Sequence, residues 1–380
     1  MNTPIENKKF FLCYFESTRN CNINCRYCMT QSADPEKEIK GEELTTSEIK
    51  SLVIDEVKKY TPLSAIAFSG GEHLTRSDAM ELLEYTADSG LWSFINTNGR
   101  LLNKKKVREI KKITDGKVVF AFSLNSISKK IHKWSRDDAL RTVVKAAKVC
   151  ASEKANFFFI LTVSKSNLET LQETVDFLKK HKIPILRSPY VLRGKGALYP
   201  ELRFDKIDME TIINPVLRDY SLSYISYTPF FASPEFLEEE WKKLDLSIEQ
   251  FGCQAAKGFV GISAEGEVAP CVHLLDSEVS CGNIRDTPLS DILKNNEVIQ
   301  NLQTRDKLKG KCGICRYKMT CGGCRALAYY ETGDYLAEDP SCFFEPENQD
   351  TRSEHEDIHN KNSAEFIRFI KDQEPWSLLF

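Results

Sequence analysis

Cysteine is the residue type whose number and spacing point most directly to chemistry in this chain. There are 13 cysteines among 380 residues, and they are concentrated in two parts of the sequence. Residues 21–28 read CNINCRYC, which places Cys21, Cys25 and Cys28 in one short segment. Thiolates at such spacing bind soft metal ions or iron–sulfur clusters. Three ligands are one fewer than a tetrahedral zinc site or a ferredoxin cluster uses, so an iron of a four-iron cluster here would be open to an external ligand.

The second group of cysteines lies in the last third of the chain. Residues 312–324 read CGICRYKMTCGGC, which contributes Cys312, Cys315, Cys321 and Cys324. Cys253 and Cys271 precede this segment and Cys342 follows it. Paired C-x2-C motifs are also typical of zinc ribbons, which is the alternative for this region. Disulfides are disfavoured because the cysteine count is odd and the chain is long enough to bury a core without them.

Composition excludes several classes of protein. Apolar residues make up 41% and charged residues 28%, as in an ordinary globular protein. The formal net charge of −3 provides no bulk electrostatic case for nucleic acid or a membrane surface as a partner. The apolar run at 157–163 is far shorter than the roughly 20 residues that span a bilayer, and the N-terminus lacks the apolar region of a signal peptide. We therefore expect a cytoplasmic protein.

Alternating apolar strands and amphipathic helices occupy the first half of the chain. Strands are predicted at 10–15, 65–69, 92–97, 118–124, 156–163 and 183–188, separated by helices at about 46–57, 78–89, 104–113, 137–151 and 168–181. This repeat predicts an α/β fold with a parallel sheet, either open and doubly wound or closed as a full or partial barrel. Functional residues then collect at the carboxyl ends of the strands.

The character of the sequence changes after this repeat. We expect a first domain at 1–195, a connector at 196–250, a Cys-rich domain at 251–345 and a tail at 346–380. The connector is rich in Gly and Pro and has one clear helix at 234–244. The tail has an amphipathic helix near 364–371, which we expect to pack onto the body, with a lid over the substrate as the alternative.

The first motif resembles that of the radical S-adenosylmethionine (AdoMet) superfamily, because C-x3-C-x2-C, Tyr27 before the third cysteine and SGGEHL at 69–74 occur together. The resemblance implies a six-stranded partial (β/α)6 TIM-like barrel followed by a small Cys-rich iron–sulfur domain. It implies that Cys21, Cys25 and Cys28 bind three irons of a 4Fe-4S cluster whose fourth iron binds AdoMet. The cofactor-binding residues that it implies are Gly70, Gly71 and Glu72 for the AdoMet amino group, Ser123 and Asn125 for the ribose, and Tyr27. The family often has an acidic residue where this chain has Asn125.

The C-terminal cysteines resemble the SPASM extension, which carries auxiliary iron–sulfur clusters. By this resemblance Cys253, Cys271 and Cys324 serve a first auxiliary 4Fe-4S cluster, and Cys312, Cys315, Cys321 and Cys342 serve a second. Two residues, Gly322 and Gly323, stand where the family often has three, which could change the cluster that Cys324 joins. The first cluster is one ligand short. Its fourth ligand is Cys281, a residue other than cysteine, or none.

The resemblance implies reductive cleavage of AdoMet to a 5′-deoxyadenosyl radical, which abstracts hydrogen from a substrate. We expect an oxidoreductase-type enzyme that modifies a ribosomally made peptide or protein. The alternatives are a small-molecule substrate, such as a tetrapyrrole propionate of the haem pathway or a sugar, and a non-enzymatic iron–sulfur electron carrier. Expected partners are a flavodoxin or ferredoxin reductant and, since the first strand begins near residue 10, a separate leader-peptide-binding protein. Arg187 and Arg193 could form an ion pair with a substrate carboxylate. His73 and His273 are expected to have structural roles.

Overall fold

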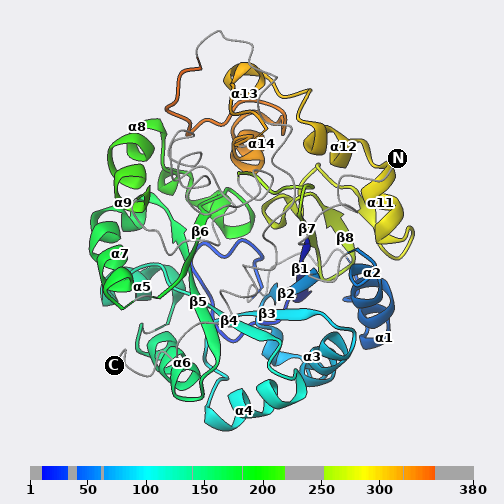
Figure 1. Cartoon of the computed structure of the whole chain (residues 1–380). Helices are drawn as coiled ribbons and strands as arrows, with labels where there is room; N and C mark the ends of the chain where they lie inside the picture. The colour runs from blue at the N-terminus through cyan, green and yellow to red at the C-terminus, as the bar shows by residue number, and fades with distance from the viewer. Residues whose placement is uncertain are drawn as a thin grey trace.

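A nine-stranded sheet organises the molecule. The computed structural model describes residues 11–32, 41–60, 64–138, 140–181, 183–218, 252–319 and 321–346. The strand order is β6-β5-β4-β3-β2-β1-β7-β8-β9, with β1 to β6 parallel (Figure 1). In the described part of the chain, β6 and β9 are the two edges and do not pair, so the barrel stays open. The predicted six-stranded partial barrel with a Cys-rich C-terminal region is confirmed.

The six predicted strands are all present, with ends that differ by at most a few residues from those expected. They are β1 Phe11–Thr18, β2 Ser64–Gly70, β3 Trp92–Thr97, β4 Val118–Ser123, β5 Asn156–Val163 and β6 Ile185–Pro189. Side chains alternate between the two faces. In β1, Phe11, Cys13 and Phe15 join the large outer core, whereas Leu12 and Tyr14 pack on the inner apolar cluster. The sequence pattern is enough to predict these strands because each contributes apolar residues to the outer face of the sheet.

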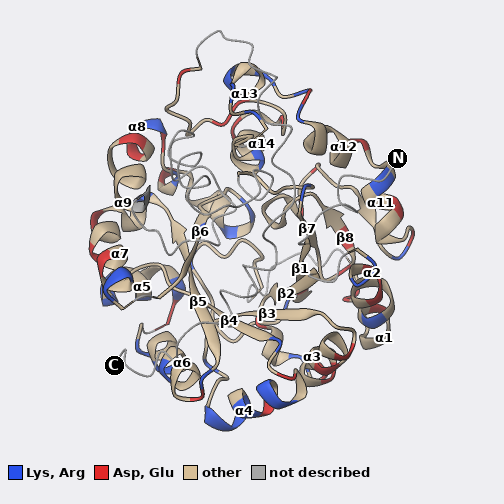
Figure 2. Ribbon diagram, in the orientation of Figure 1, with Lys and Arg blue, Asp and Glu red and all other residues tan. Residues whose placement is uncertain are grey.

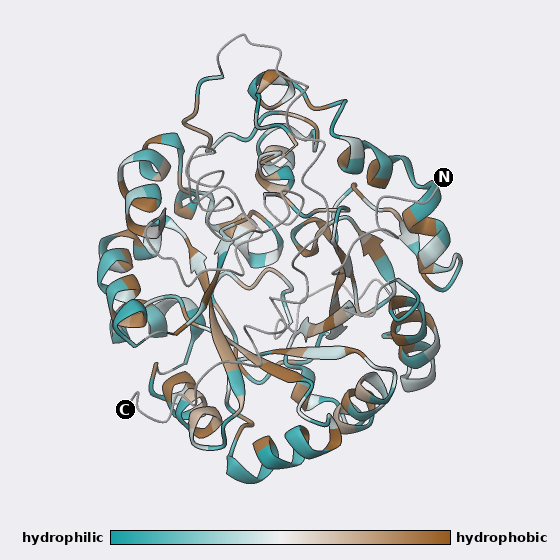
Figure 3. Ribbon diagram, viewed as in Figure 1, coloured by the Kyte–Doolittle hydropathy of each residue, from teal (hydrophilic) through white to brown (hydrophobic). Residues whose placement is uncertain are grey.

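Helices cover the outer face of this sheet (Figure 1). They are α3 Ala79–Asp88, α4 Lys104–Ile113, α5 Lys129–Arg136, α6 Leu140–Ser152 and α7 Leu171–Lys180, the last preceded by a 3-10 turn at Lys165–Thr170. Hydrophilic residues lie on their outward sides and hydrophobic residues on the strands (Figure 3). In the described part of the chain, the inner face of the sheet lines a cavity instead. The sequence pattern does not predict α5, because this helix buries the polar residues His132 and Ser135 rather than an apolar stripe.

The first helical segment begins with the predicted capping box. Thr45 Oγ1 accepts a hydrogen bond from the backbone N–H of Glu48, and the Glu48 side chain accepts one from the backbone of Thr45. The segment then has three parts: α1 Thr46–Glu48, a π-helical stretch at Ile49–Ile54 and α2 Asp55–Val57.

The Cys-rich region extends the barrel sheet instead of forming a separate layer. Its first strand, β7 Phe259–Ile262, pairs in parallel with β1, and β8 Glu267–Ala269 and β9 Gly282–Asn283 continue antiparallel. The helices α11 Leu289–Asn295, α12 Glu297–Thr304, α13 Gly310–Ile314 and α14 Arg325–Thr332 follow. Strand β7 is only four residues long, so its sequence pattern is too short to predict that it pairs with β1.

The connector is described as far as residue 218, where it has short helical turns and the helices α8 Lys206–Asp208 and α9 Asn214–Arg218. The helix predicted at 234–244 and the tail after residue 346 lie outside the described residues. Among the described helices, none combines the length and the apolar character needed to traverse a bilayer.

Candidate active site

The loop that follows β1 places three cysteines at the mouth of the barrel. Cys21, Cys25 and Cys28 all line the cavity enclosed by the inner faces of the strands. The Cys28 thiol lies 3.1 Å from Thr30 Oγ1, which in turn donates to the carbonyl of Gly70 at 3.3 Å. The loop is therefore tied to the end of β2.

Gly70 and Gly71 hold this loop by close backbone approach. A Cβ on Gly70 would lie 2.4 Å from the carbonyl oxygen of Thr18, and one on Gly71 would lie 1.9 Å from that of Asn20. The backbone N–H of Gly71 donates to Thr18 O at 2.7 Å, and that of Glu72 donates to Asn20 O at 2.7 Å. The two glycines line the cavity. A side chain at either position would clash with the backbone that leads into the cysteine loop, so both positions require glycine.

The Glu72 carboxylate is fully buried and links β2 to β3. Its Oε2 accepts from Thr97 Oγ1 at 3.0 Å and from the backbone N–H of Asn98 at 2.9 Å. Burial raises the pKa of this carboxyl to about 7. Glu72 is not among the described residues that line the cavity, although its Oε1 has no hydrogen-bond partner. The predicted pairing with an AdoMet ammonium stays a prediction.

Tyr27, Ser123 and Asn125 all lie on the cavity wall. Asn125 Nδ2 donates to Tyr27 Oη at 2.8 Å and to Ser135 Oγ at 3.0 Å, so the amide is oriented from both sides. Its Oδ1 is buried and has no hydrogen-bond partner. An oriented acceptor of this kind fits a ligand hydroxyl, and a neutral amide can accept that bond as an acidic side chain would.

Three of the C-terminal cysteines face the same cavity. Cys253, Cys271 and Cys324 line it together with the N-terminal three. Cys281 does not: it is buried in the apolar core beside the β8–β9 pair, near Glu267. The structure therefore offers no cavity position for Cys281 as a fourth ligand of this set.

The other four cysteines gather in a separate cleft, lined by Cys312, Cys315, Cys321 and Cys342. Asp339 and Arg325 lie between the two sets. Asp339 Oδ2 accepts from the backbone N–H of Cys324 at 2.6 Å, and Arg325 donates to Cys312 Sγ at 3.5 Å. Cys324 lines the same cavity as Cys253 and Cys271 despite the shortened spacing, and the assignment of the cysteines to two clusters stays a prediction.

The chemistry of these donors suits iron–sulfur clusters. Burial raises the pKa of Cys25 to about 11 and those of Cys271 and Cys342 to about 12, so these thiols become thiolates only when a cation binds them. Among the described residues, no three His, Cys, Asp or Glu side chains converge on a single metal ion.

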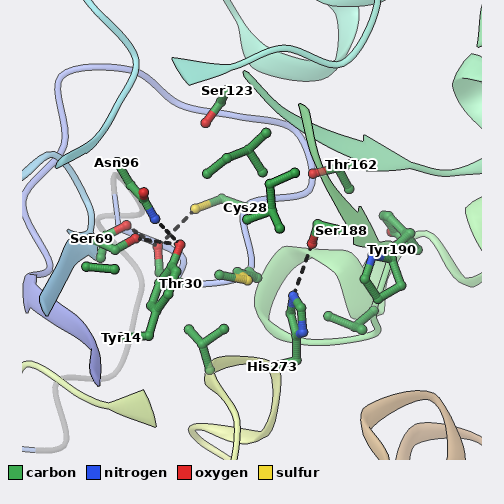
Figure 4. A pocket seen from close by; sticks show the side chains of 18 of the residues that line it. Tyr14, Cys28, Thr30, Ser69, Asn96, Ser123, Thr162, Ser188, Tyr190 and His273 are labelled. Atoms are coloured by element: carbon green, nitrogen blue, oxygen red, sulfur yellow. Dashed lines mark hydrogen bonds between the residues drawn. The ribbon is translucent and has the colours of Figure 1, made fainter. Parts of the chain in front are cut away.

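Polar side chains from several strands project into the cavity beyond the cysteine loop (Figure 4). Ser69 Oγ donates to Tyr14 Oη at 3.1 Å, and Asn96 bonds the same hydroxyl. On the opposite side, His273 Nε2 lies 3.2 Å from Ser188 Oγ, while its Nδ1 lies 3.7 Å from Cys271 Sγ. Sequence reasoning took His273 as structural. Its position two residues after Cys271 is the signal that could have placed it here.

The two arginines near β6 have different surroundings. Arg193 is buried and donates to Glu16 Oε1 at 2.6 Å and to Asp276 Oδ2 at 2.7 Å, so protein carboxylates occupy it. Arg187 is buried on the cavity wall, and burial lowers its pKa to about 10. The described residues that line the cavity include Arg136, Arg187 and Arg325 but no Asp or Glu. The described lining thus includes three basic residues and no acidic one, and the Arg325 guanidinium already donates to Ala337 O at 2.7 Å.

Comparisons with known proteins show the family and the fold of the chain. The family model described as the radical SAM superfamily matches residues 15–178, and the iron–sulfur cluster-binding SPASM domain matches 253–322. An AdoMet-dependent heme synthase of Methanosarcina barkeri is 32% identical over 346 residues, which cover 87% of this chain and 96% of that protein. One from Nitratidesulfovibrio vulgaris is 27% identical, with 87% and 92% covered. A PqqA peptide cyclase of Bradyrhizobium diazoefficiens is 25% identical, with 87% and 85% covered. The crystal structure of Streptococcus suis SuiB bound to S-adenosylmethionine shares the fold, with a TM-score of 0.66 at 20% identity, and covers 88% of this chain and 78% of that one.

Proposed function

Because this chain belongs to the radical SAM superfamily of enzymes and carries an iron–sulfur-binding SPASM domain, we propose that it oxidises a carboxylate-bearing tetrapyrrole of the haem pathway. The family's cofactors are AdoMet, a 4Fe-4S cluster and auxiliary iron–sulfur clusters. When bound, they supply a 5′-deoxyadenosyl radical that removes a hydrogen atom from the substrate.

Residues of this chain would hold these groups as follows. Cys21, Cys25 and Cys28 bind the AdoMet-cleaving cluster on a loop that Gly70 and Gly71 pin in place. Asn125 Oδ1 accepts a hydrogen bond from a ribose hydroxyl, and Tyr27 fixes the orientation of that amide. Cys253, Cys271 and Cys324 bind the first auxiliary cluster on the far side of the same cavity, and Cys312, Cys315, Cys321 and Cys342 bind the second in the separate cleft.

The charge of the cavity is the observation that carries the choice of substrate. Arg187, buried on β6, is among the residues that line the cavity, and no Asp or Glu is among the described lining residues. A guanidinium in a dry site binds a carboxylate with two parallel hydrogen bonds, which orients the substrate as well as binding it. The relative that is 32% identical is named a heme synthase, and a tetrapyrrole with propionate side chains would supply such carboxylates.

The reaction that fits is oxidative decarboxylation of a propionate to a vinyl group. One hydrogen atom leaves the carbon adjacent to the ring and forms 5′-deoxyadenosine. The carboxylate then leaves as CO2, the carbon–carbon double bond forms, and one electron passes to an acceptor. Arg187 would hold the carboxylate until the hydrogen atom is removed, and the apolar inner faces of the strands keep water from the radical.

A ribosomally made peptide is the second candidate, and it is the substrate that the sequence resemblance favours. The relative named PqqA peptide cyclase, 25% identical over most of both chains, favours it. A peptide with an acidic side chain would also suit the cationic lining. The two candidates differ in product, since a tetrapyrrole substrate would lose CO2.

The experiment is anaerobic turnover of iron coproporphyrin III with AdoMet and dithionite, with products followed by mass spectrometry. We expect each reacted propionate to lose CO2 and two hydrogens. Arg187→Gln should raise KM about 10- to 100-fold, because a charge-assisted hydrogen bond contributes about 1.5–3 kcal/mol. Arg187→Lys keeps the charge but not the two parallel N–H donors of the guanidinium, so its KM should lie between those of the wild type and Arg187→Gln. AdoMet cleavage without substrate should persist in both variants.

The methyl ester of the same porphyrin is the matched control for the carboxylate. The wild type and Arg187→Gln should bind the ester equally weakly, because neither can form the ion pair. A wild-type enzyme that cleaves AdoMet yet leaves iron coproporphyrin III unchanged would remove the tetrapyrrole proposal and favour a peptide.

A further inference from the structure

A positively charged hollow on the outside of the molecule adjoins the cysteine loop. We call it the α5 surface. The residues that line it include Cys25, Arg26, Lys130, Lys133, Trp134 and Lys195. Helix α5 supplies three of these residues, and Figure 2 marks its Lys and Arg positions in blue on the ribbon at the left of the molecule.

The α5 surface and the inner cavity share Cys25. The backbone N–H of Arg26 donates to Ser135 O at 3.0 Å, and that of Lys195 donates to Cys28 O at 3.0 Å. The residues that form the hollow thus also hold the backbone of the cysteine loop. A cluster bound by Cys25 would lie directly behind this surface.

The charge of the α5 surface is unbalanced. Four cations and a single acid, Asp137, line it, in a chain whose net charge is −3. Arg26, Lys130 and Lys133 are exposed, and none of the three forms a salt bridge with a described residue. Basic helix α4 differs: Arg108 pairs with Glu153, and no α4 residue lines the cavity or the α5 surface.

Aromatic side chains lie among these charges. Trp134 is 39% exposed, and neighbouring Leu198 is 69% exposed. The Arg26 guanidinium lies 4.6 Å from the centre of the Trp134 ring. Trp, Tyr and Arg are the residues that most often anchor protein–protein interfaces, and a charged rim steers a partner of opposite sign. A hollow of this composition fits an acidic protein better than a small anion.

We propose that the α5 surface is the docking site of a small acidic electron-transfer protein that delivers the electron needed for AdoMet cleavage. Each cleavage consumes one electron, which the donor loses and the cluster gains. Electron transfer favours the shortest path, and Cys25 is the residue that reaches both the hollow and the cavity. The inference rests on the proposed binding of the cluster by Cys21, Cys25 and Cys28, and it is independent of the substrate.

The test compares charge reversal on two basic helices. Lys130→Glu/Lys133→Glu changes α5, and Lys105→Glu/Lys112→Glu makes the same change in charge at exposed positions of α4. The probe is a fluorescently labelled acidic flavodoxin, whose affinity for the reconstituted enzyme is measured by anisotropy between low and high salt. We expect the α5 variant to weaken binding at least tenfold at low salt and to reduce the salt dependence. The α4 variant should bind as the wild type does.

AdoMet cleavage supplies a second measurement. With reduced flavodoxin the α5 variant should produce 5′-deoxyadenosine at least tenfold more slowly, whereas with dithionite, which needs no docking site, it should match the wild type. Equal flavodoxin affinity in the wild type and the α5 variant, or equal weakening by the α4 variant, would overturn the proposal. If dithionite-supported cleavage also falls, the cluster itself is disturbed, and the anisotropy measured with Lys130→Ala/Lys133→Ala decides the question.

Discussion

The Glu72 carboxylate accepts a hydrogen bond at 2.9 Å from the backbone N–H of Asn98, which joins the segment after β2 to the end of β3. Asn98 Nδ2 in turn donates to Asn22 Oδ1 at 2.7 Å, next to Cys21. A buried acid thereby positions the cysteine loop from beneath. This role for the glutamate of SGGEHL does not require contact with a ligand.

Glu72→Gln should change how stability depends on pH. Burial raises the folded-state pKa of Glu72 from 4.5 to about 7, so between these values the folded chain holds a proton that the unfolded chain has released. The free energy of unfolding should therefore fall as pH rises through this window, by about 2 kcal/mol between pH 5.5 and 7.5. The variant should lose this slope, as measured by denaturant unfolding. The exposed residue Glu81, changed to Gln, is the control, and an unchanged slope in Glu72→Gln would contradict the assignment.

Replacing Cys21, Cys25 and Cys28 together by alanine should abolish AdoMet cleavage. The iron content after anaerobic reconstitution should fall by about four atoms from about twelve, because each 4Fe-4S cluster carries four irons. Iron analysis and 5′-deoxyadenosine production are the measurements. The matched variant changes Cys253, Cys271 and Cys324, and it should also lose about four irons while retaining AdoMet cleavage. Zinc at the C-terminal cysteines of the wild type would refute the auxiliary clusters.

Cys281→Ala should leave the iron content and the electron paramagnetic resonance spectrum of the reduced enzyme unchanged. Cys281 is buried in the apolar core and absent from the cavity that Cys253, Cys271 and Cys324 line. Its loss removes one small apolar contact and should cost about 1 kcal/mol of stability. A fall of several iron atoms in Cys281→Ala, comparable to that in Cys271→Ala, would restore Cys281 as the fourth ligand.

Arg193→Met should destabilise the fold by up to about 3–5 kcal/mol, because it removes the buried partner of the fully buried Glu16 carboxylate, which keeps only its pair with Arg19. Glu16 lies on β1 and Asp276 in the Cys-rich region, so Arg193 ties the barrel to that region. Thermal unfolding measures the loss, and Lys50→Met, which breaks an exposed pair with Glu81, should cost less than about 1 kcal/mol. Adding Glu16→Leu to Arg193→Met should recover part of the stability, and a further loss would show that the pair is not the cause.

Local patterns in the sequence were enough to predict much of the fold of this protein. The six parallel strands follow from short apolar runs, and the capping box at Thr45 and Glu48 follows from residue types at a fixed spacing. The C-x3-C-x2-C loop and the Gly70–Gly71 turn lie where each strand ends. These features depend on neighbouring residues in the chain, so the sequence alone predicts them.

Long-range contacts decided the rest. Helix α5 was not predicted because it buries polar side chains, yet it forms the charged surface beside Cys25. Arg187 and Arg193 look alike in sequence, but Arg193 pairs with Glu16 and Asp276 from distant segments, whereas Arg187 is among the residues that line the cavity.

The sequence by itself predicted which residues bind iron and AdoMet, and it determined the partial barrel that presents them. Only the tertiary structure decided where Cys281 and Cys324 lie, because the pairing of β7 with β1 brings Cys253 and Cys271 to the cavity that Cys324 also lines, while Cys281 stays in the core. The physical reason is that ligand spacing and strand periodicity are local properties. The position of a thiol relative to a cavity depends instead on how segments more than 200 residues apart pack against each other.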